Sequence, residues 1–301
     1  GLELFKIAEK NNVLLLFEAS VAGGIPIIKT LKNNIFLNKV KKISGILNGT
    51  TNFILTTMNN KNLDFNEALE IAKSKGYTSD SESQLDIGGY DSAHKLTLLS
   101  TLSFGSTINF HNNNIEGIYN IKILDIINAE KFGYKIKLIS EAILIDDKML
   151  LNTGPKLIGI NNPLSNVDNV LNAINIETDQ LSSLFLEGEG AGGLATSSSV
   201  ISDLYEIAAK SNLLSLGFHT KQLNEYDKFN ILEIKSPYYI RIMTQDIAGV
   251  LSKITGYFEN FDISIEKIIQ LPDDNKNNIP IPIIIFTHLV KKNKLLNAIQ
   301  K

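Results

Sequence analysis

Hydrophobic and polar positions along the first 210 residues follow two different periods. Apolar residues at helical spacing, flanked by residues suited to helix ends, predict helices at residues 2–10, 26–31, 52–59, 67–75, 90–104 and 196–210. Short apolar or alternating runs predict strands at residues 13–17, 40–47 and 183–186. Residues 107–160 alternate β-rich runs with one helical piece. We therefore expect an α/β (α+β) chain with a mixed sheet.

A change of pattern separates a second unit from the first. Residues 211–236 are polar and lack periodicity, which favours a linker. Beyond them the pattern predicts a strand, a helix, two strands and a helix, at residues 238–244, 247–261, 263–271, 280–287 and 292–301. This βαββα order is typical of a ferredoxin-like unit without its last strand.

Composition and charge exclude several classes of protein. Apolar residues make up 44% of the 301 residues, charged residues 20%, and the net charge is −3. This balance predicts a globular protein and gives no electrostatic reason to expect nucleic acid or a membrane surface as a partner. There is no cysteine, so disulfides and thiolate metal sites are excluded, and a cytoplasmic location is expected. The apolar runs are too short to span a bilayer.

The densest group of polar residues lies at residues 76–95. Asp91 and Lys95 are four residues apart in a predicted helix, so both project from one face. One interpretation is an exposed ion pair worth about 0.3–0.5 kcal/mol. The other is a functional lysine, which is favoured because four carboxylates precede it and the helix that follows is strongly apolar.

This segment resembles the signature of the homoserine dehydrogenases. Ala-x-x-x-Gly-Tyr leads there through an acidic loop to Asp-x-x-Gly-x-Asp-x-x-x-Lys, and the matching residues are Ala72, Gly76, Tyr77, Asp86, Gly89, Asp91 and Lys95. Three more stretches resemble the family in the same order, at residues 17–28, 45–54 and 188–197. The resemblance covers essentially the whole chain.

The resemblance implies an NAD(P)-dependent enzyme that interconverts L-homoserine and L-aspartate 4-semialdehyde, in the biosynthesis of threonine, methionine and isoleucine. Lys95 would donate a proton to the carbonyl oxygen, and Asp91 would bind the substrate and hold Lys95. Tyr77, Thr50 and Asn52 would line the substrate cleft. The competing interpretation is a non-catalytic, amino-acid-binding regulator derived from a dehydrogenase.

The acidic loop departs from the family pattern, in which a glutamate grasps the ammonium group of the substrate. The loop is one residue longer here, so counting back from Lys95 places Asp80 at that position and counting forward from Gly76 places Ser79 there. We favour Asp80, because an ammonium group needs an anion. Asp86 is a further substrate-binding candidate, and Glu82 is the other alternative.

Two glycine-rich loops complete the predicted site. Glu18 and the loop after it resemble the family's site for a monovalent cation, Na⁺ or K⁺, with the carbonyl groups of Val21, Gly23 and Ile25 as further ligands. The alternative is a tight strand-to-helix turn with Glu18 at the helix dipole.

The second loop, residues 188–193, matches the pattern G-x-G-x-x-G. It lacks the βαβ context of a dinucleotide fingerprint, because a predicted linker follows its helix. The resemblance instead places this loop beside the nicotinamide, with Gly76, Gly188 and Gly190 as cofactor contacts.

The second unit resembles the ACT domain, an amino-acid sensor. Its marker is the segment at residues 246–251, and Asp246, Gly249 and Val250 would contact the effector, for which threonine is implied. The alternative is a dimerising module without a ligand. A homodimer or a higher oligomer is expected.

We expect four parts along the chain: the tail of a dinucleotide-binding (Rossmann) domain at residues 1–17, the catalytic domain at 18–210, the linker at 211–236 and an incomplete ACT domain at 237–301. Because the sequence starts at glycine and stops inside a predicted helix, we expect the natural protein to extend beyond both ends.

Overall fold

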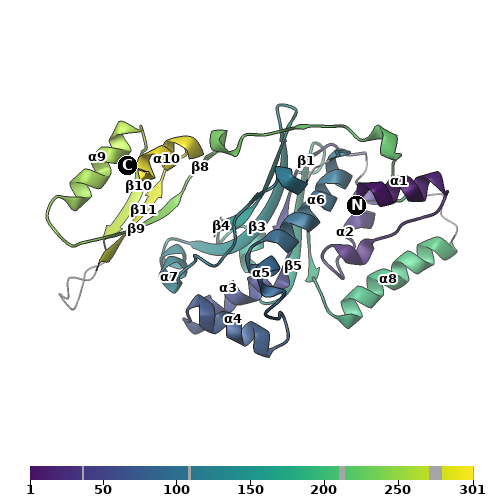
Figure 1. The fold of residues 1–301 in the computed structure, drawn as a ribbon, viewed down its shortest axis with the longest axis horizontal. Helices are drawn as coiled ribbons and strands as arrows, with labels where there is room; N and C mark the ends of the chain where they lie inside the picture. Colours follow the sequence, from purple (N-terminus) through teal and green to yellow (C-terminus); the bar gives the residue numbers. More distant parts are fainter. Residues whose placement is uncertain (36, 108–109, 210–213, 271–279, 301) are drawn as a thin grey trace. The chain divides into compact units, whose positions relative to one another are not determined.

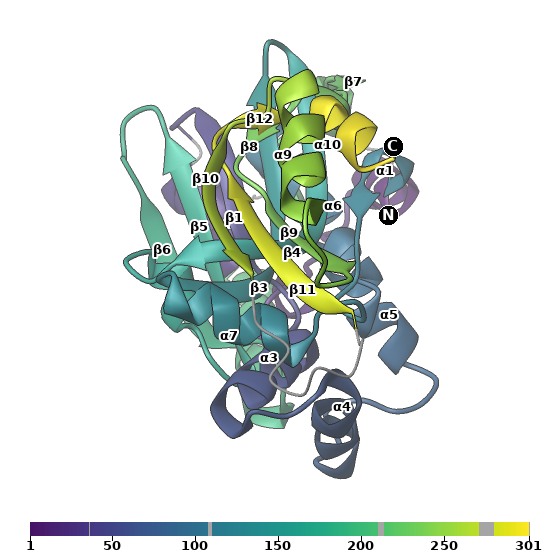
Figure 2. The same cartoon turned by 90° about the vertical axis from the view of Figure 1, so that its left-hand side faces the viewer.

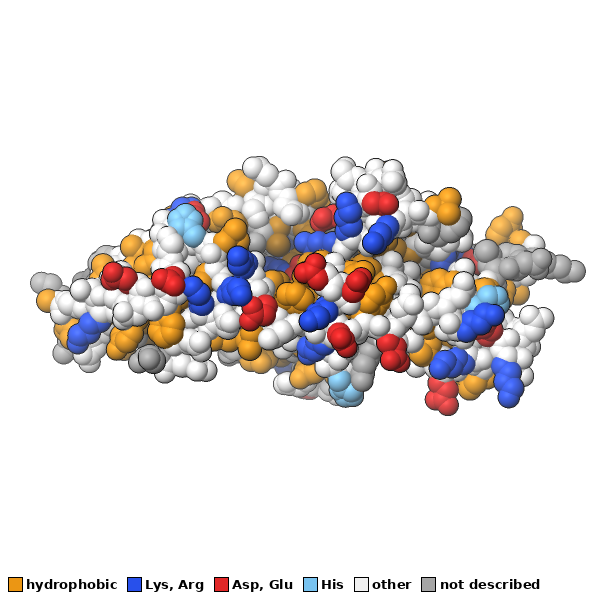
Figure 3. All heavy atoms as spheres, turned by 90° about the horizontal axis from the view of Figure 1, so that it is seen from above, with side chains coloured by type: hydrophobic (Ala, Val, Ile, Leu, Met, Phe, Trp, Pro, Cys, Tyr) orange, Lys and Arg blue, Asp and Glu red, His pale blue; other side chains and the backbone are white. Residues whose placement is uncertain are grey.

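The protein is described by a computed structural model that covers residues 1–35, 37–107, 110–209, 214–270 and 280–300. The chain divides into two compact units, Gly1–Phe229 and Asn230–Lys301. Both combine helices with a sheet, as the hydrophobic pattern predicts. No helix in the described part has the length and apolar character needed to cross a bilayer. Figure 3 shows basic and acidic side chains interspersed on the face that it presents.

A seven-stranded sheet forms the centre of the first unit. Its order is β2-β4-β3-β1-β5-β6, and β7 pairs with β4. The strands are β1 (Val40–Ile46), β2 (Asn114–Ile115), β3 (Tyr134–Ile145), β4 (Lys148–Gly159), β5 (Leu171–Thr178), β6 (Leu184–Glu189) and β7 (Asp227–Lys228). The five strands β4, β3, β1, β5 and β6 pair antiparallel in that order, whereas β2 and β7 run parallel to β4. The predicted mixed sheet is confirmed.

Eight α-helices are described around this sheet. They are α1 (Leu2–Lys10), α2 (Ile27–Lys29), α3 (Gly49–Lys61), α4 (Phe65–Ser74), α5 (Ser83–Ile87), α6 (Tyr90–Phe104), α7 (Ile123–Lys131) and α8 (Gly193–Ala208). Figure 1 shows α3, α5 and α6 lying together in front of the sheet. The helix predicted at residues 90–104 is confirmed at both ends, and α5 was not predicted.

Strand alternation divides the core between the two faces of the sheet. Ile43 of β1 is paired with Ala142 of β3, and both are buried in one cluster with Leu96 and Leu99 of α6. The neighbouring side chain on the other face, Ile46, is buried against the segment before β5. Successive side chains of a strand point to opposite faces. This alternation fixes α6, and with it Asp91 and Lys95, beside the end of β1.

Two segments differ from the sequence-based expectations. Residues 13–17 form no strand in the described structure; the amide of Leu15 donates instead to Ser215 Oγ at 2.8 Å. The predicted linker at 211–236 is only partly a connection, because Leu216 is buried in the first core and β7 pairs with β4. Residues 211–213 lie outside the described part.

The elements of the second unit are β8 (Lys235–Ser236), β9 (Tyr239–Thr244), α9 (Val250–Asn260), β10 (Ile265–Gln270), β11 (Ile281–Thr287), β12 (Val290–Lys291) and α10 (Lys292–Ile299). Its main elements, β9, α9, β10, β11 and α10, have the predicted βαββα order, and two short strands, β8 and β12, are additional. The strands β10, β11 and β9 form an antiparallel sheet in that order, and β12 pairs with β8. Figure 2 shows α9 and α10 side by side along this sheet. Apolar side chains of β9, β11 and both helices make one core.

A carboxylate on α1 fastens that helix to a later loop. Glu9 accepts hydrogen bonds from the backbone N–H of Thr220 (3.0 Å) and its hydroxyl (2.7 Å), and it lies 2.5 Å from His219 Nδ1. The hydroxyl of Thr220, its amide and then His219 lower the pKa of Glu9 to about 2, from 4.5. This carboxylate therefore contributes its full stabilisation above pH 4.5 and loses it as the pH falls toward about 2.

We predict that the Thr220 amide loses protection from hydrogen exchange across this acidic window. In a Glu9→Gln variant the exchange of that amide should be fast on both sides of the window, because the amide side chain is a weaker acceptor. Hydrogen exchange followed by mass spectrometry between pH 2 and 5 measures this. Equal protection in both proteins would contradict the prediction.

Candidate active site

The N-terminus of α6 brings Asp91 and Lys95 together at the end of β1. Gly89 precedes the helix with φ of +81°, in the left-handed region that favours glycine. Lys95 Nζ donates to Asp91 Oδ2 at 2.7 Å and to the carbonyl oxygen of Leu47 at 3.0 Å. An ammonium group has three N–H donors. One N–H of Lys95 therefore remains for a ligand among the described contacts, and the side chain is 22% exposed.

A second carboxylate, Asp86 on α5, belongs to the same group. Asn48 Nδ2 donates to Asp86 Oδ1 (2.7 Å) and to Asp91 Oδ2 (2.9 Å), and Thr78 Oγ1 donates to Asp86 Oδ2 (2.9 Å). Burial raises the pKa of Asp86, while the hydrogen bonds from Asn48 and Thr78 oppose that rise. With all three ionised, Asp86, Asp91 and Lys95 carry a net charge of −1, which suits a ligand with its own ammonium group.

The structure does not join Asp80 to this group. Its side chain is 91% exposed and pairs with Lys73 Nζ at 2.7 Å, and this ion pair lowers the pKa of Asp80. Glu82 accepts a hydrogen bond from Ser79 Oγ within the same loop. Of the carboxylates between Gly76 and Asp91, it is Asp86 that is hydrogen bonded beside Lys95. Asp86 was a further candidate from the sequence, but counting along the loop favoured Asp80, because spacing does not show which way the loop turns.

Three other predicted substrate residues lie on or next to α3. Thr50 Oγ1 donates to the carbonyl oxygen of Tyr77 at 2.9 Å, which holds the start of the acidic loop at this helix. The Tyr77 ring packs edge-on against Phe53 and is 40% exposed. Asn52 is 1% exposed, and its amide donates to the carbonyl oxygens of Val167 and Leu171. Its side chain is turned into the protein, so the structure gives it a supporting position and not the expected place on a cleft.

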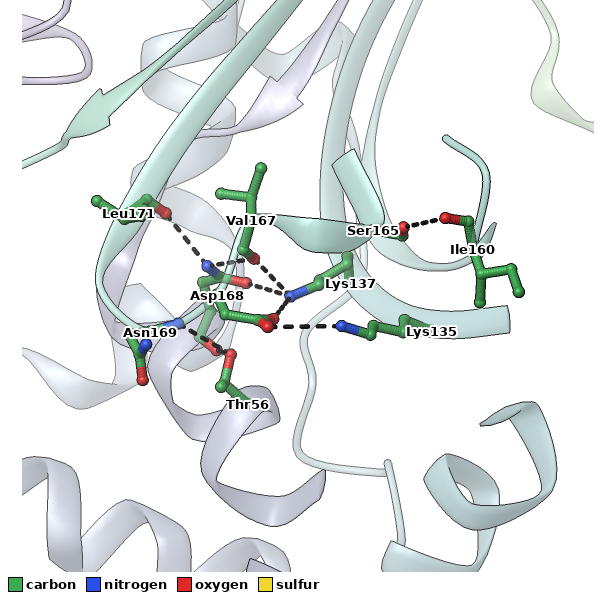
Figure 4. Close-up of polar contacts among 10 residues, drawn as sticks. Thr56, Lys135, Lys137, Ile160, Ser165, Val167, Asp168, Asn169 and Leu171 are labelled. Atoms are coloured by element: carbon green, nitrogen blue, oxygen red, sulfur yellow. Dashed lines mark hydrogen bonds and ion pairs between the residues drawn. The ribbon is translucent and has the colours of Figure 1, made fainter. Parts of the chain in front are cut away.

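Asn52 Oδ1 accepts a hydrogen bond from Lys137, which belongs to a buried cluster that the sequence pattern did not indicate. Figure 4 shows Lys137 pointing toward Val167 and Asp168. Lys137 Nζ donates to the Val167 carbonyl oxygen (2.6 Å), Asp168 Oδ1 (2.8 Å) and Asn52 Oδ1 (3.1 Å). Burial lowers the pKa of Lys137, whereas the hydrogen bond and charge of Asp168 raise it. The cluster ties α3 and β3 to the segment that leads into β5.

We predict that Lys137→Met lowers the free energy of unfolding by about 2–3 kcal/mol, because two buried acceptors lose their donor. Lys135→Met is the matched control: Lys135 also pairs with Asp168, at 3.4 Å, but is 27% exposed. Its loss should cost about 0–1 kcal/mol. Urea denaturation of both variants gives the comparison, and equal losses would contradict it.

The loop after Glu18 is a tight turn with two successive residues in the left-handed region. Ala22 and Gly23 have φ of +56° and +47°. Glu18 is 2% exposed, and its two carboxylate oxygens accept the backbone N–H groups of Ile28 (2.8 Å) and Lys29 (2.9 Å) at the start of α2. Burial raises the pKa of Glu18, and these two hydrogen bonds lower it.

Carbonyl oxygens of this loop already accept protein donors. Ser199 Oγ donates to the Gly23 carbonyl oxygen at 2.7 Å, and the amide of Ile27 donates to the Ile25 carbonyl oxygen at 2.7 Å. Each carbonyl oxygen has a second lone pair, so neither bond excludes a cation. Within the described residues no three His, Cys, Asp or Glu side chains gather to hold a metal ion. A cation here would therefore need backbone oxygens in addition to the carboxylate of Glu18.

The two glycine-rich loops lie against each other. The Gly24 amide donates to the Glu189 carbonyl oxygen at 2.9 Å, and a Cβ on Gly23 would lie 2.5 Å from the Gly190 carbonyl oxygen. A Cβ on Gly190 would lie 2.2 Å from Asn172 Cγ, so close packing requires glycine there. A Cβ on Gly188 would lie 3.1 Å from Ile25. The predicted cation loop and the predicted nicotinamide loop are thus one assembly.

Gly76 occupies the other predicted cofactor position. It follows α4 with φ of +73°, and a Cβ there would meet no atom within 4 Å.

In the second unit, Gly249 precedes α9 with φ of +88°, and Asp246 Oδ1 accepts a hydrogen bond from Gln270 Nε2 at 2.8 Å. Val250 packs on the core of that unit. The three predicted effector residues therefore surround the turn between β9 and α9.

Comparisons with known proteins agree with this architecture. Residues 26–205 match the family model of homoserine dehydrogenase, and residues 238–301 match that of the ACT domain. The homoserine dehydrogenase of Neisseria gonorrhoeae is 37% identical over 99% of this chain and 69% of its own length; that of Helicobacter pylori is 39% identical over 97% and 68%.

Solved structures give the same result. The homoserine dehydrogenase of Thiobacillus denitrificans superposes with a TM-score of 0.90 and 34% identity, over 100% of this chain and 69% of its own. A hyperthermophilic archaeal homoserine dehydrogenase mutant in complex with NADPH superposes with a TM-score of 0.60 and 31% identity, over 69% of this chain and 60% of its own. The chain belongs to the homoserine dehydrogenase family and carries an ACT domain.

Proposed function

We propose that this protein interconverts L-homoserine and L-aspartate 4-semialdehyde with NAD(P), and that Lys95 transfers the proton. The observation that carries the proposal is the remaining N–H of an ammonium group whose other two donors are fixed by Asp91 and Leu47. Family membership supports the reaction, and the NADPH complex of the archaeal relative supports the cofactor. When bound, the nicotinamide supplies or accepts the hydride.

Lys95, Asp91 and Asp86 have different roles in the proposed reaction. In the direction of reduction, Lys95 donates its remaining proton to the carbonyl oxygen, and in the direction of oxidation the neutral amine accepts the hydroxyl proton. Asp91 holds the lysine in place. Asp86, which lies beside the lysine and is not paired with another cation in the described contacts, binds the substrate ammonium.

The glycine loops fit a nicotinamide cofactor. Gly76, Gly192 and Gly193 have open space where a Cβ would stand, so a flat ring can approach the backbone there without meeting a side chain. Gly188 and Gly190 are packed from behind by Ile25 and Asn172, which holds the loop in place. These residues would hold the nicotinamide end of the cofactor.

We also propose that Glu18, with the carbonyl groups of Val21, Gly23 and Ile25, binds Na⁺ or K⁺. The net charge of the surrounding side chains supports this proposal. Lys29 Nζ lies 3.4 Å from Asp203 Oδ1 and 3.3 Å from Glu206 Oε2, and Lys32 Nζ lies 3.9 Å from Glu206 Oε1. Together with Glu18 this group has three carboxylates and two ammonium groups, which leaves one negative charge. Thermal denaturation in NaCl, KCl and choline chloride tests the site: Glu18→Gln should remove any stabilisation specific to one cation.

For the ACT unit we propose threonine as the effector, bound at Asp246, Gly249 and Val250, in a homodimer or a higher oligomer. The conformation of the β9–α9 turn supports a backbone site for an amino acid. Titration calorimetry with threonine, together with sedimentation analysis, tests both parts. Absence of heat with unaltered kinetics would favour a purely dimerising module.

The domain limits expected from the sequence also remain proposals. We propose that residues 1–17 belong to a dinucleotide-binding domain and that residues 18–210 form the catalytic domain. The match of residues 26–205 to the homoserine dehydrogenase family model supports the second limit. The chain spans 69% of the length of the Neisseria gonorrhoeae enzyme.

The experiment that tests the activity is homoserine-dependent reduction of NAD⁺ or NADP⁺ by the complete protein, followed at 340 nm. Turnover that requires homoserine supports the proposal. Threonine binding without any turnover would point instead to the regulatory alternative.

A further inference from the structure

We propose that Asn48 is a positioning residue that fixes the two active-site carboxylates, Asp86 and Asp91, relative to Lys95. The inference rests on the proposed function and concerns a residue of the segment 45–54 that has no role among the predicted site residues. The amide nitrogen of Asn48 donates to Asp86 Oδ1 at 2.7 Å and to Asp91 Oδ2 at 2.9 Å.

The other end of the Asn48 side chain is fixed. Its Oδ1 accepts the backbone N–H of Thr51 at 2.8 Å, so the residue caps α3. Its backbone carbonyl oxygen accepts the Thr51 hydroxyl at 3.1 Å, and the residue is 5% exposed. Both functional ends of the amide are therefore in use, and the N-terminus of α3 sets the place of its NH₂ group.

This NH₂ group controls how the carboxylates face the lysine. Asp91 Oδ2 accepts from Asn48 and from Lys95, so the carboxylate is held by two donors from different elements. Asp86 and Asp91 repel each other, and a donor between two anions stabilises their approach. Without the amide, Asp86 keeps Thr78 as a hydrogen-bond donor, and Asp91 keeps Lys95.

The loss of the amide should also change when Asp86 ionises. The charged and hydrogen-bonding groups that act on Asp86 are Asn48, Thr78, Asp91 and Lys95. Burial raises the pKa of Asp86 and the Asn48 hydrogen bond lowers it. Removing this donor therefore raises the pKa of Asp86 further, and the ionised form that binds a substrate ammonium is lost at a higher pH as the solution is acidified.

Asn48→Ser separates this role from capping. Serine is as good an N-cap as asparagine, so α3 keeps its first hydrogen bond, but the NH₂ group is gone. Asn162→Ser is the matched control, because Asn162 Oδ1 caps a short helical turn by accepting the Leu164 amide at 3.0 Å and makes no described contact with Asp86 or Asp91.

In the complete protein we expect Asn48→Ser to raise KM for homoserine and to lower kcat, each by about tenfold, since the substrate anchor and the proton donor are both displaced. The acidic limb of the kcat/KM profile should move to higher pH. Asn162→Ser should leave KM and the limb unchanged. Circular dichroism checks that the variants fold. Asn48→Asp keeps the N-cap and the shape of the side chain, and it should also move the acidic limb of the kcat/KM profile to higher pH.

A second readout does not depend on turnover. Titration of ¹³C-aspartate-labelled complete protein, with the Asp86 signal identified by its loss in Asp86→Asn, should show Asp86 ionising at higher pH in Asn48→Ser than in the wild type. A folded Asn48→Ser protein with the wild-type limb, KM and Asp86 titration overturns the inference. A wild type that does not oxidise homoserine refutes the proposed function instead, and the titration then decides the role of Asn48 in the carboxylate pair.

Discussion

Lys95→Ala in the complete protein is expected to lower kcat for homoserine oxidation by about 10³-fold or more. General acid–base catalysis contributes about 10²–10⁴-fold, and here the same ammonium group also orients the reacting oxygen. The variant should still fold, because it loses only two hydrogen bonds. Their acceptors are Asp91, which is 32% exposed to solvent, and the carbonyl oxygen of Leu47. Steady-state kinetics at saturating homoserine and cofactor gives the change in kcat.

Lys135→Ala is the control for this measurement. Lys135 is also a partly exposed lysine paired with an aspartate, at 27% exposure, but it lies in β3 beside Asp168. Its removal should change kcat by less than about twofold. A Lys95→Ala protein with turnover near that of Lys135→Ala would remove Lys95 from the mechanism.

Asp86→Asn is expected to raise KM for homoserine by about 10- to 100-fold, the range for losing one hydrogen bond to a charged group. The amide keeps the size of the side chain but removes the charge that attracts the substrate ammonium. Because burial raises the pKa of Asp86, the wild-type affinity for homoserine should decline on acidification at a higher pH than for an ordinary aspartate. In Asp86→Asn this pH dependence should disappear.

The same assay decides between Asp86 and Asp80. Asp80 is exposed and paired with Lys73, so Asp80→Ala should change KM by less than about threefold. The opposite result, a large effect at Asp80 and a small one at Asp86, would mean that the acidic loop rearranges when substrate binds and that the counting from Lys95 gave the correct residue.

Much of the fold could be predicted from the spacing of apolar residues, because most segments with a clear spacing form the expected helix or strand in the structure. The helix at 90–104 could be predicted because it is rich in leucine and is bounded by Gly89 and Gly105, and the βαββα unit because its apolar runs have the lengths of strands and helices. The strand β5 was missed, although it pairs along its length with β1. Its residues Asn172 and Asn175 interrupt the apolar run, and only the surrounding sheet makes a strand there favourable.

The site was predictable only in part. Asp91 and Lys95 are neighbours on one helix, so spacing alone brought them together. Asn48 lies 38 residues before Asp86 and 43 before Asp91, and no local pattern connects them. In the acidic loop, Asp80 pairs with Lys73 and Asp86 accepts from Asn48, and counting along the sequence reveals neither contact.

The most direct test of the central claim is a crystal structure of the complete protein with homoserine bound. We expect the homoserine hydroxyl oxygen within about 2.6–3.2 Å of Lys95 Nζ, with the substrate ammonium group on Asp86. A hydroxyl group bound out of reach of that amine, with the lysine still paired only to Asp91 and Leu47, would contradict it.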